Sequence, residues 1–335
     1  MSLTPAATTD TATAPSSWSK VAGVVAILIA IIVVFLLAFA LPSVNSEPHD
    51  IPIAVVGPGQ VVTALGDALE ENAPGGFEIT VADSADDARE LILNRDVYGA
   101  FIVDPASGLT VDTASAASSY VATILEAAAQ QIGAVTSLPV VVDDVVPFPE
   151  ADPRGIGLSA GALPMALGGW IAAVATVALV RGNRQRLATA GSFAVLGGLA
   201  LTSTLYFWIG TFEDNFWMTT LGAMLGIAAT AFLVLGLGRL LKGVGIAIAA
   251  VLLILLGNPL SGLSSAPEVL PVPWGAIGQL LPPGATGTLL RNLGFFDGAA
   301  TLHPILVLTA WLVLGLAMYA FAVVRDRRGE GRLTE

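Results

Sequence analysis

The sequence predicts a polytopic α-helical membrane protein with six transmembrane helices and an α/β extracytoplasmic domain between the first and second helices. Three observations predict this fold class: six long apolar stretches free of charged residues, a one-sided distribution of cations, and strands that alternate with helices in residues 42–156. Composition agrees, because 55% of the residues are hydrophobic and only 12% are charged, whereas about a quarter of a soluble domain is charged.

Each apolar stretch is about twenty residues long, enough at ~1.5 Å rise per residue to cross the ~30 Å hydrocarbon core of a bilayer. The first stretch could also be a signal peptide, because Ala38-Phe39-Ala40 resembles a cleavage site. Its length favours an uncleaved anchor. The six expected spans are Val21–Leu41, Gly157–Val180, Ala188–Ile209, Trp217–Leu237, Val244–Leu263 and Pro304–Val324.

Basic residues predict the orientation of these spans. Alternate threading from a cytoplasmic N-terminus places ten of the 14 Lys and Arg residues inside, in agreement with the positive-inside rule. Only Arg89, Arg95, Arg154 and Arg291 fall outside. We therefore expect a plasma-membrane protein with both termini in the cytoplasm. The inner cations are Lys20, Arg181, Arg184, Arg186, Arg239, Lys242, Arg325, Arg327, Arg328 and Arg332.

The chain divides into five segments. Residues 1–20, rich in Ala, Thr, Ser and Pro, are expected to be a disordered cytoplasmic tail. After the span at 21–41, the ectodomain at 42–156 holds 18 of the 26 acidic residues. A five-helix membrane domain follows at 157–324, and 325–335 forms a cytoplasmic tail. Because phosphate binding needs clustered Lys and Arg, an acidic exterior with a basic inner rim argues against nucleic acid as a partner and suits a lipid bilayer.

The ectodomain shows strand and helix patterns in alternation, which predicts a small α/β domain. Ser84 followed by Asp87 is a capping-box arrangement that predicts the start of a helix. The expected strands are Ile51–Val56, Phe77–Ala82, Tyr98–Val103, Leu109–Asp112 and Val140–Val146, the third one stopped by Asp104-Pro105, and the expected helices are Val61–Asn72, Ala85–Asn94 and Ser118–Ala134.

No motif predicts a catalytic or cofactor site. Gly57-Pro58-Gly59 lacks the spacing of a nucleotide-binding loop and reads as a strand-to-helix turn. Neither Lys20 nor Lys242 precedes a Ser or Thr, so a phosphate-binding loop is excluded. Cysteine is absent, which removes thiolate and disulfide chemistry. We expect a protein that is not an enzyme and has no cofactor.

Metal binding is not expected either. His49 and His303 are far apart in the sequence, and neither is accompanied by a cluster of carboxylates, so a zinc site is not predicted. The acidic pairs Asp86-Asp87 and Asp143-Asp144 lack the spaced ligands of a calcium loop and are interpreted as solvated faces.

Polar residues within the spans suggest a transport path. Thr202, Ser203 and Thr204 lie near the outer end of the third span, and Asn258-Pro259 interrupts the fifth. Broken helices often mark transport paths, although Asn258-Pro259 could equally end a helix at the surface. Residues 264–300 are too rich in proline for one helix and apolar enough to enter the bilayer. We expect a re-entrant or interfacial segment there, centred on Leu270–Leu281.

The chain resembles the membrane subunit of type-2 ATP-binding-cassette (ABC-2) exporters, within them the phage-infection-protein-like branch. The resemblance rests on the order of one span, a large external α/β domain and five spans. It also rests on Ile51–Gly57, Val81–Asn94 (VADSADDARELILN) and Tyr98–Pro105 (YGAFIVDP), with Asp152-Pro153-Arg154-Gly155 and the Leu281–Asn292 segment in support. It implies a permease subunit that exports a hydrophobic or envelope-related substrate, is powered by a separate ATP-binding subunit, and works as a homodimer or paired permease.

The inner loops are the candidate contacts for that ATPase: Arg181, Arg184, Arg186, Arg239 and Lys242. These cations could also serve only to fix the topology. A second class of function remains open, in which the protein is a non-transporting envelope scaffold that docks partners through its ectodomain.

Overall fold

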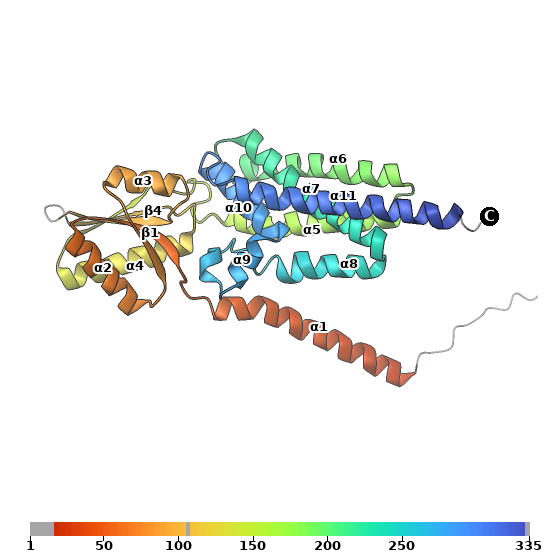
Figure 1. The fold of residues 1–335 in the computed structure, drawn as a ribbon, viewed down its shortest axis with the longest axis horizontal. Helices are drawn as coiled ribbons and strands as arrows, with labels where there is room; N and C mark the ends of the chain where they lie inside the picture. The colour runs from red at the N-terminus through yellow and green to blue at the C-terminus, as the bar shows by residue number, and fades with distance from the viewer. Residues whose placement is uncertain (1–16, 105–107, 332–335) are drawn as a thin grey trace, which may run out of the picture.

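The computed structural model describes residues 17–104 and 108–331, and it consists of an α/β domain at one end of an α-helical bundle (Figure 1). We keep the name ectodomain for this α/β domain, although its placement outside the cell is still a prediction. The first helix, α1 (Trp18–Val44), leads into the ectodomain, and the chain enters the bundle at α5 (Ile156–Leu179). The predicted disordered tail falls almost wholly outside the described residues, as do Pro105 and Arg332.

The ectodomain contains a five-stranded sheet with the order β2-β1-β3-β4-β5. Strand β1 is parallel to β2 and β3, β4 is antiparallel to β3, and β5 is parallel to β4. Every predicted strand and helix of this domain is confirmed, with bounds that differ by a few residues. The elements are β1 (Ile51–Val56), α2 (Gly59–Asn72), β2 (Phe77–Val81), α3 (Ala85–Leu93), β3 (Gly99–Asp104), β4 (Gly108–Thr113), α4 (Ser119–Thr136) and β5 (Val140–Asp144).

Crossover handedness explains where the ectodomain helices lie. The chain moves from β1 to β2 in one direction along the sheet and from β2 to β3 in the other. Because connections between parallel strands are right-handed, α2 and α3 must cover opposite faces. Figure 1 shows α3 on one face and α2 with α4 on the other. The core between them is built from side chains such as Ile53, Phe101 and Leu125, all fully buried.

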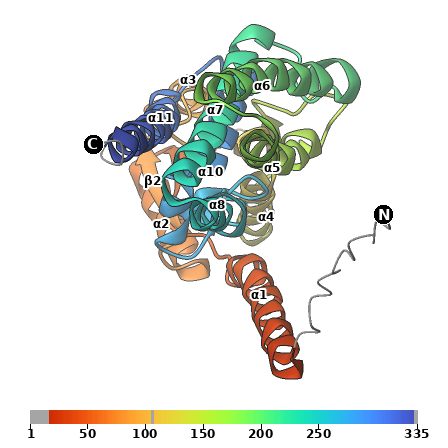
Figure 2. The same cartoon turned by 90° about the vertical axis from the view of Figure 1, so that its right-hand side faces the viewer.

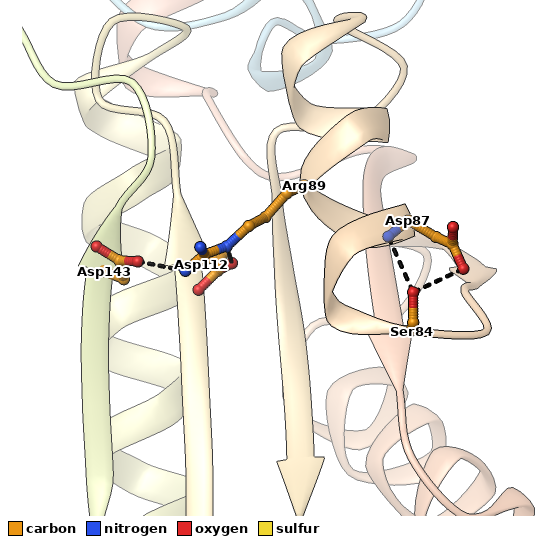
Figure 3. Close-up of polar contacts among 5 residues, drawn as sticks. All are labelled: Ser84, Asp87, Arg89, Asp112 and Asp143. Carbon is orange, nitrogen blue, oxygen red and sulfur yellow. Dashed lines mark hydrogen bonds and ion pairs between the residues drawn. The ribbon is translucent and has the colours of Figure 1, made fainter.

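An arginine on α3 ties two strands together. Arg89 Nε donates to Asp112 Oδ2 at 2.8 Å, and its Nη2 donates to Asp143 Oδ2 at 2.5 Å (Figure 3). Asp112 is fully buried, so this pairing offsets the cost of burying a carboxylate. The interpretation of Asp143 as part of a merely solvated face was wrong. The predicted cap is confirmed, because Ser84 Oγ accepts a hydrogen bond from the backbone N–H of Asp87.

Helix α7 (Phe216–Leu241) is the centre of the bundle, with most of its length buried. Around it pack α5, α6 (Asn183–Thr204), α8 (Gly243–Ala250), α10 (Pro282–Phe295) and α11 (Leu302–Gly331) (Figure 2). Helix α1 stands apart, and none of its apolar window is buried. A helix that is apolar all round and unpacked needs lipid around it.

Four helices within the described residues are long and apolar enough to cross a membrane: Trp18–Pro42, Asn183–Ile209, Phe216–Leu241 and Leu302–Arg328. They support the membrane class and match four of the six expected spans. Two shorter apolar helices, Leu167–Leu179 within α5 and Gly243–Leu256, occupy the other two positions. Six membrane crossings therefore remain a prediction.

The fifth expected span, Val244–Leu263, was drawn too long. Helix α8 continues as the π-helix η2 (Val251–Leu256) and then gives way to turns at 257–260. Pro259 has no N–H to donate and disfavours a helical conformation at Asn258, which stops the helix. The resulting 14 residues cover only about 21 Å.

Helix α10 completes the pass that α8 and η2 leave unfinished. Along α7, α8 packs on the C-terminal half, where Gly245 meets the Leu237 carbonyl, and α10 packs on the N-terminal half, where Thr286 meets Gly226. The two helices meet where Gly257 touches Pro283. The bundle thus contains one helical pass broken into two half-helices.

The chain between the half-helices forms a hairpin, defined here as residues 258–281. It rises to the ectodomain at the 3-10 helix η3 (Pro267–Val269) and descends again through α9 (Trp274–Gln279). Its lower end lies beside α11, where Trp311 Nε1 donates to the Leu280 carbonyl at 2.8 Å. Trp311 is about nine residues into α11, ~14 Å from its start. This geometry supports the expected re-entrant segment, whose placement in lipid remains a prediction.

The expectation that residues 264–300 do not form one helix is confirmed, because the segment is divided among η3, α9 and α10. Pro282 and Pro283 occupy the first turn of α10, where a missing N–H costs nothing, so they start a helix rather than break one.

The hairpin is packed into the ectodomain rather than lying free. Ala266, Val269 and Phe296 belong to the same hydrophobic core as the sheet. Ser118 Oγ donates to the Ser265 carbonyl at 2.5 Å. The ectodomain and the hairpin are therefore one packed unit.

Close packing of α7 against α11 gives a stability prediction. A Cβ on Gly315 would lie 2.5 Å from the Phe232 carbonyl, a backbone group that cannot turn aside. We expect G315A to lower the unfolding free energy by about 1–3 kcal/mol, the usual cost of overpacking. Thermal unfolding of the purified chain in detergent measures this. G191A is the control, since nothing lies within 4 Å of its added methyl; equal melting of both variants would contradict the packing.

The absence of cysteine allows a direct test of topology. The sheet and the start of α6 lie at opposite ends of the molecule (Figure 1). Thr80 on β2 and Gln185 in the first turn of α6 are both exposed. We expect a membrane-impermeant maleimide to label T80C in intact cells and Q185C only after permeabilisation. Labelling of both from outside would show that α5 does not cross the membrane.

Candidate functional site

A cavity of about 490 Å³ lies where the ectodomain meets the bundle, and we call it the junction cavity. Its walls come from the start of β1, the residues before β3, the hairpin, α10 and the start of α11. Its size is typical of small-molecule sites. Because the walls come from five segments distant in sequence, only the folded chain creates the cavity.

Arg291 is the most unusual residue of the junction cavity. It projects from α10 with only 6% of its surface exposed. Its Nη2 donates to the Leu263 carbonyl at 2.9 Å, while its Nε is buried without a partner. A guanidinium has five N–H donors, so most of its capacity is not used by this bond. Within the described residues, no ion pair includes Arg291.

Arg95 brings a second guanidinium to the same cavity. It lies between two aromatic rings, 5.1 Å from the Tyr98 centroid and 4.8 Å from that of Phe296. Such cation–π contacts hold the charge in place without neutralising it. The Arg95 Nε is also buried and unpartnered.

Tyr98 and Glu268 join the ectodomain to the hairpin inside the cavity. Tyr98 Oη donates to Glu268 Oε2 at 2.7 Å, and the Glu268 carbonyl accepts from the backbone N–H of His49 at 3.0 Å. Burial, and then the negative charge of Glu268, raise the pKa of Tyr98. The phenol therefore stays protonated and remains a donor at every physiological pH.

Both histidines of the chain, His49 and His303, line the junction cavity. Their separation in sequence concealed this proximity. Among the described residues, no group of three or more His, Cys, Asp and Glu side chains is arranged to hold a metal ion. The histidines instead add polar, titratable groups to the cavity wall.

The residues proposed for a transport path are not brought together. Thr202 is buried and donates to the Gly198 carbonyl at 2.5 Å, and Thr204 donates to the Ala200 carbonyl, so both hydroxyls are used within their own helix. Ser203 lies between them on α6. Asn258 and Pro259 belong to the turns after η2, and the Asn258 carbonyl accepts from Ser261. None of these five residues lines the junction cavity.

The candidate ATPase-contact residues all lie at the end of the bundle opposite the ectodomain. Arg186, Arg239 and Lys242 line one cavity of about 260 Å³ there. Arg239 pairs with Asp326 at 2.7 Å, and Arg186 donates to the carbonyls of α5's last turn. Arg181 and Arg184 are exposed and do not line this cavity. The sequence indicated that these cations share one side of the membrane domain, but it did not indicate that Asp326 pairs with Arg239.

Arg291 could have been identified from the sequence as a lone cation in a proline-rich apolar segment. Its neighbours Gln279, Thr288 and Asn292, which also line the cavity, carry no such signal. Comparison with protein-family models, curated proteins and solved structures finds no match to the chain. Function therefore has to be inferred from the cavity and the bundle.

Removing the Tyr98 hydroxyl should loosen the hairpin. Y98F leaves Glu268 without its phenol donor, and a hydrogen bond to a charged group is worth about 1.5–3 kcal/mol. We expect amide hydrogen exchange in residues 264–272 to accelerate roughly tenfold or more. Y120F is the control, because Tyr120 is exposed on α4. Unchanged exchange in Y98F would show that this bond does not hold the hairpin.

Proposed function

We propose that this chain is the permease subunit of a membrane exporter, that a separate ATPase powers it, and that it carries a hydrophobic or envelope-related substrate. The observation that carries the proposal is the broken pass: two half-helices meet at Gly257 and Pro283, and the hairpin inserted between them lines a cavity that also contains charged side chains. Discontinuous helices of this kind form the substrate sites of many transporters.

Energetics support a role in binding for the broken pass. Irregular backbone within an apolar bundle is tolerated where protein or a water-filled cavity satisfies its polar groups. Here Gln279 Nε2 donates to the Ser261 carbonyl at 2.8 Å and Arg291 to that of Leu263. A scaffold would gain nothing from this arrangement, whereas a permease gains a cavity near the outer surface.

In this proposal the ectodomain is extracytoplasmic, the protein is multi-pass in the plasma membrane, and both termini are cytoplasmic. The cations at the far end of the bundle then face the cytoplasm, as the positive-inside rule requires. Arg181 and Arg184 extend into solvent there and are available to an ATPase partner. A homodimer or paired permease is part of the same proposal, following the ABC-2 resemblance.

The docking scaffold remains the second candidate, because of the ectodomain's β5 edge. Val141 and Val142 on this edge strand are 55% and 41% exposed. Exposed apolar edge strands can accept a strand from a partner. This candidate predicts capture of an envelope protein in the absence of any ATP-binding chain.

Coupling to an ATPase can be tested with two charge reversals. R181E/R184E changes only exposed side chains, whereas Arg186 must be left intact because it caps α5. We expect an ATP-binding chain to co-purify with the wild-type protein in mild detergent, as identified by mass spectrometry, and to be lost or reduced at least tenfold in the variant.

R154E is the matched control, since Arg154 is exposed at the ectodomain end of α5. It should leave co-purification unchanged. If no ATP-binding chain accompanies the wild type, the exporter proposal fails and the docking scaffold is favoured.

A further inference from the structure

The junction cavity holds two guanidinium groups that form no ion pair within the described residues. Arg95 and Arg291 both line it, and the four ion pairs of the described residues include neither. Two acids, Asp50 and Glu268, also line the cavity, and the Glu268 carboxylate accepts a hydrogen bond from Tyr98. A buried unpaired cation is costly. The two unpaired guanidinium groups therefore favour an anionic group placed between them.

The unused donors indicate which anion fits. The Nε atoms of both arginines are buried without partners, and both side chains face the same space. The planar guanidinium fork matches the oxygens of phosphate or carboxylate, and phosphate can accept from several donors at once. Thr288 and Gln279 on the same wall add neutral polar groups.

The cavity is also lined by apolar residues of the hairpin. Val272, which lines it, is 71% exposed, and Trp274 beside it is 45% exposed. Past Trp274, an apolar groove of about 680 Å³ runs between the hairpin and α1. Tryptophan at such a position is typical of a membrane–water interface. A ligand that enters past Trp274 must therefore contact both the apolar groove and the charged wall of the cavity.

We propose that the junction cavity binds an anionic amphiphile, with a phosphate-bearing headgroup between Arg95 and Arg291 and its apolar chain along Val272 and Trp274. The inference rests on the proposed function, because it names the class of substrate that the same cavity would accept. Arg95 sits in the ectodomain and Arg291 in the bundle, so the headgroup would join the two.

Native mass spectrometry of the purified full chain in detergent tests this, with phosphatidylglycerol, phosphatidylcholine and inorganic phosphate as the three probes. We expect phosphatidylglycerol to bind at least tenfold more tightly than phosphatidylcholine, and inorganic phosphate not to displace it at equal concentration. R95Q and R291Q should each weaken phosphatidylglycerol binding about tenfold or more, the loss expected for one charge-assisted hydrogen bond.

R154Q is the charge-matched control, because Arg154 is exposed and does not line the cavity; it should bind as the wild type does. Arg95 is half-buried, so R95Q keeps the test valid if R291Q fails to fold, as thermal unfolding would show. Equal binding of the two lipids, unchanged binding in R95Q, or displacement by inorganic phosphate would overturn the proposal. A missing ATPase partner would refute the exporter function and leave this binding result standing.

Discussion

The structure depends on one constraint, which is that backbone polar groups within an apolar bundle must be hydrogen-bonded. A continuous helix meets it internally, but the hairpin between the half-helices does not. Three side chains donate hydrogen bonds to carbonyl groups of the hairpin and so fix its path. The bonds run from Gln279 to the Ser261 carbonyl, from Arg291 to that of Leu263, and from Trp311 to that of Leu280. The junction cavity is the space that this path leaves open, so its shape follows from the same bonds.

The hairpin also decides how the ectodomain relates to the membrane domain. A tethered domain would have a core of its own, but here Val269 and Phe296 are part of the core beneath the sheet. Phe296 directly follows α10, and its ring lies against Arg95. Because packed interiors are close to incompressible, a movement of α10 has to move the sheet. Either candidate function must therefore treat the ectodomain and α10 as one body.

The ectodomain could be predicted almost element by element, since its signals are local: alternation of apolar residues, turn residues, and the Ser84 cap. The half-helix α10 could not, because Pro282 and Pro283 start a helix only in the context of what precedes them. The junction cavity could not be predicted from the sequence for another reason. His49 and His303 meet only through tertiary packing, and no local pattern encodes it. Hydroxyl residues such as Thr202 suggested a polar path that the structure does not bring together. A hydroxyl in a span can bond to a carbonyl of its own helix, as Thr202 does.

The two polar ends of the bundle are linked by a short physical route. At the end opposite the ectodomain, which is the inner end in the proposed topology, Lys242 lies between α7 and α8 and lines the cation-rich cavity. From Lys242 the chain runs through α8 and η2 to Gly257, which contacts Pro283 at the start of α10. Helix α10 then ends at the junction cavity. Helix α11 also lines both cavities, with residues of its first turn at the junction cavity and residues towards its end at the cation-rich cavity. An ATPase acting on the inner end would therefore have two elements through which to reach the junction cavity. Of these, only the broken pass contains a joint, and a joint allows one half to shift while the other stays packed against α7.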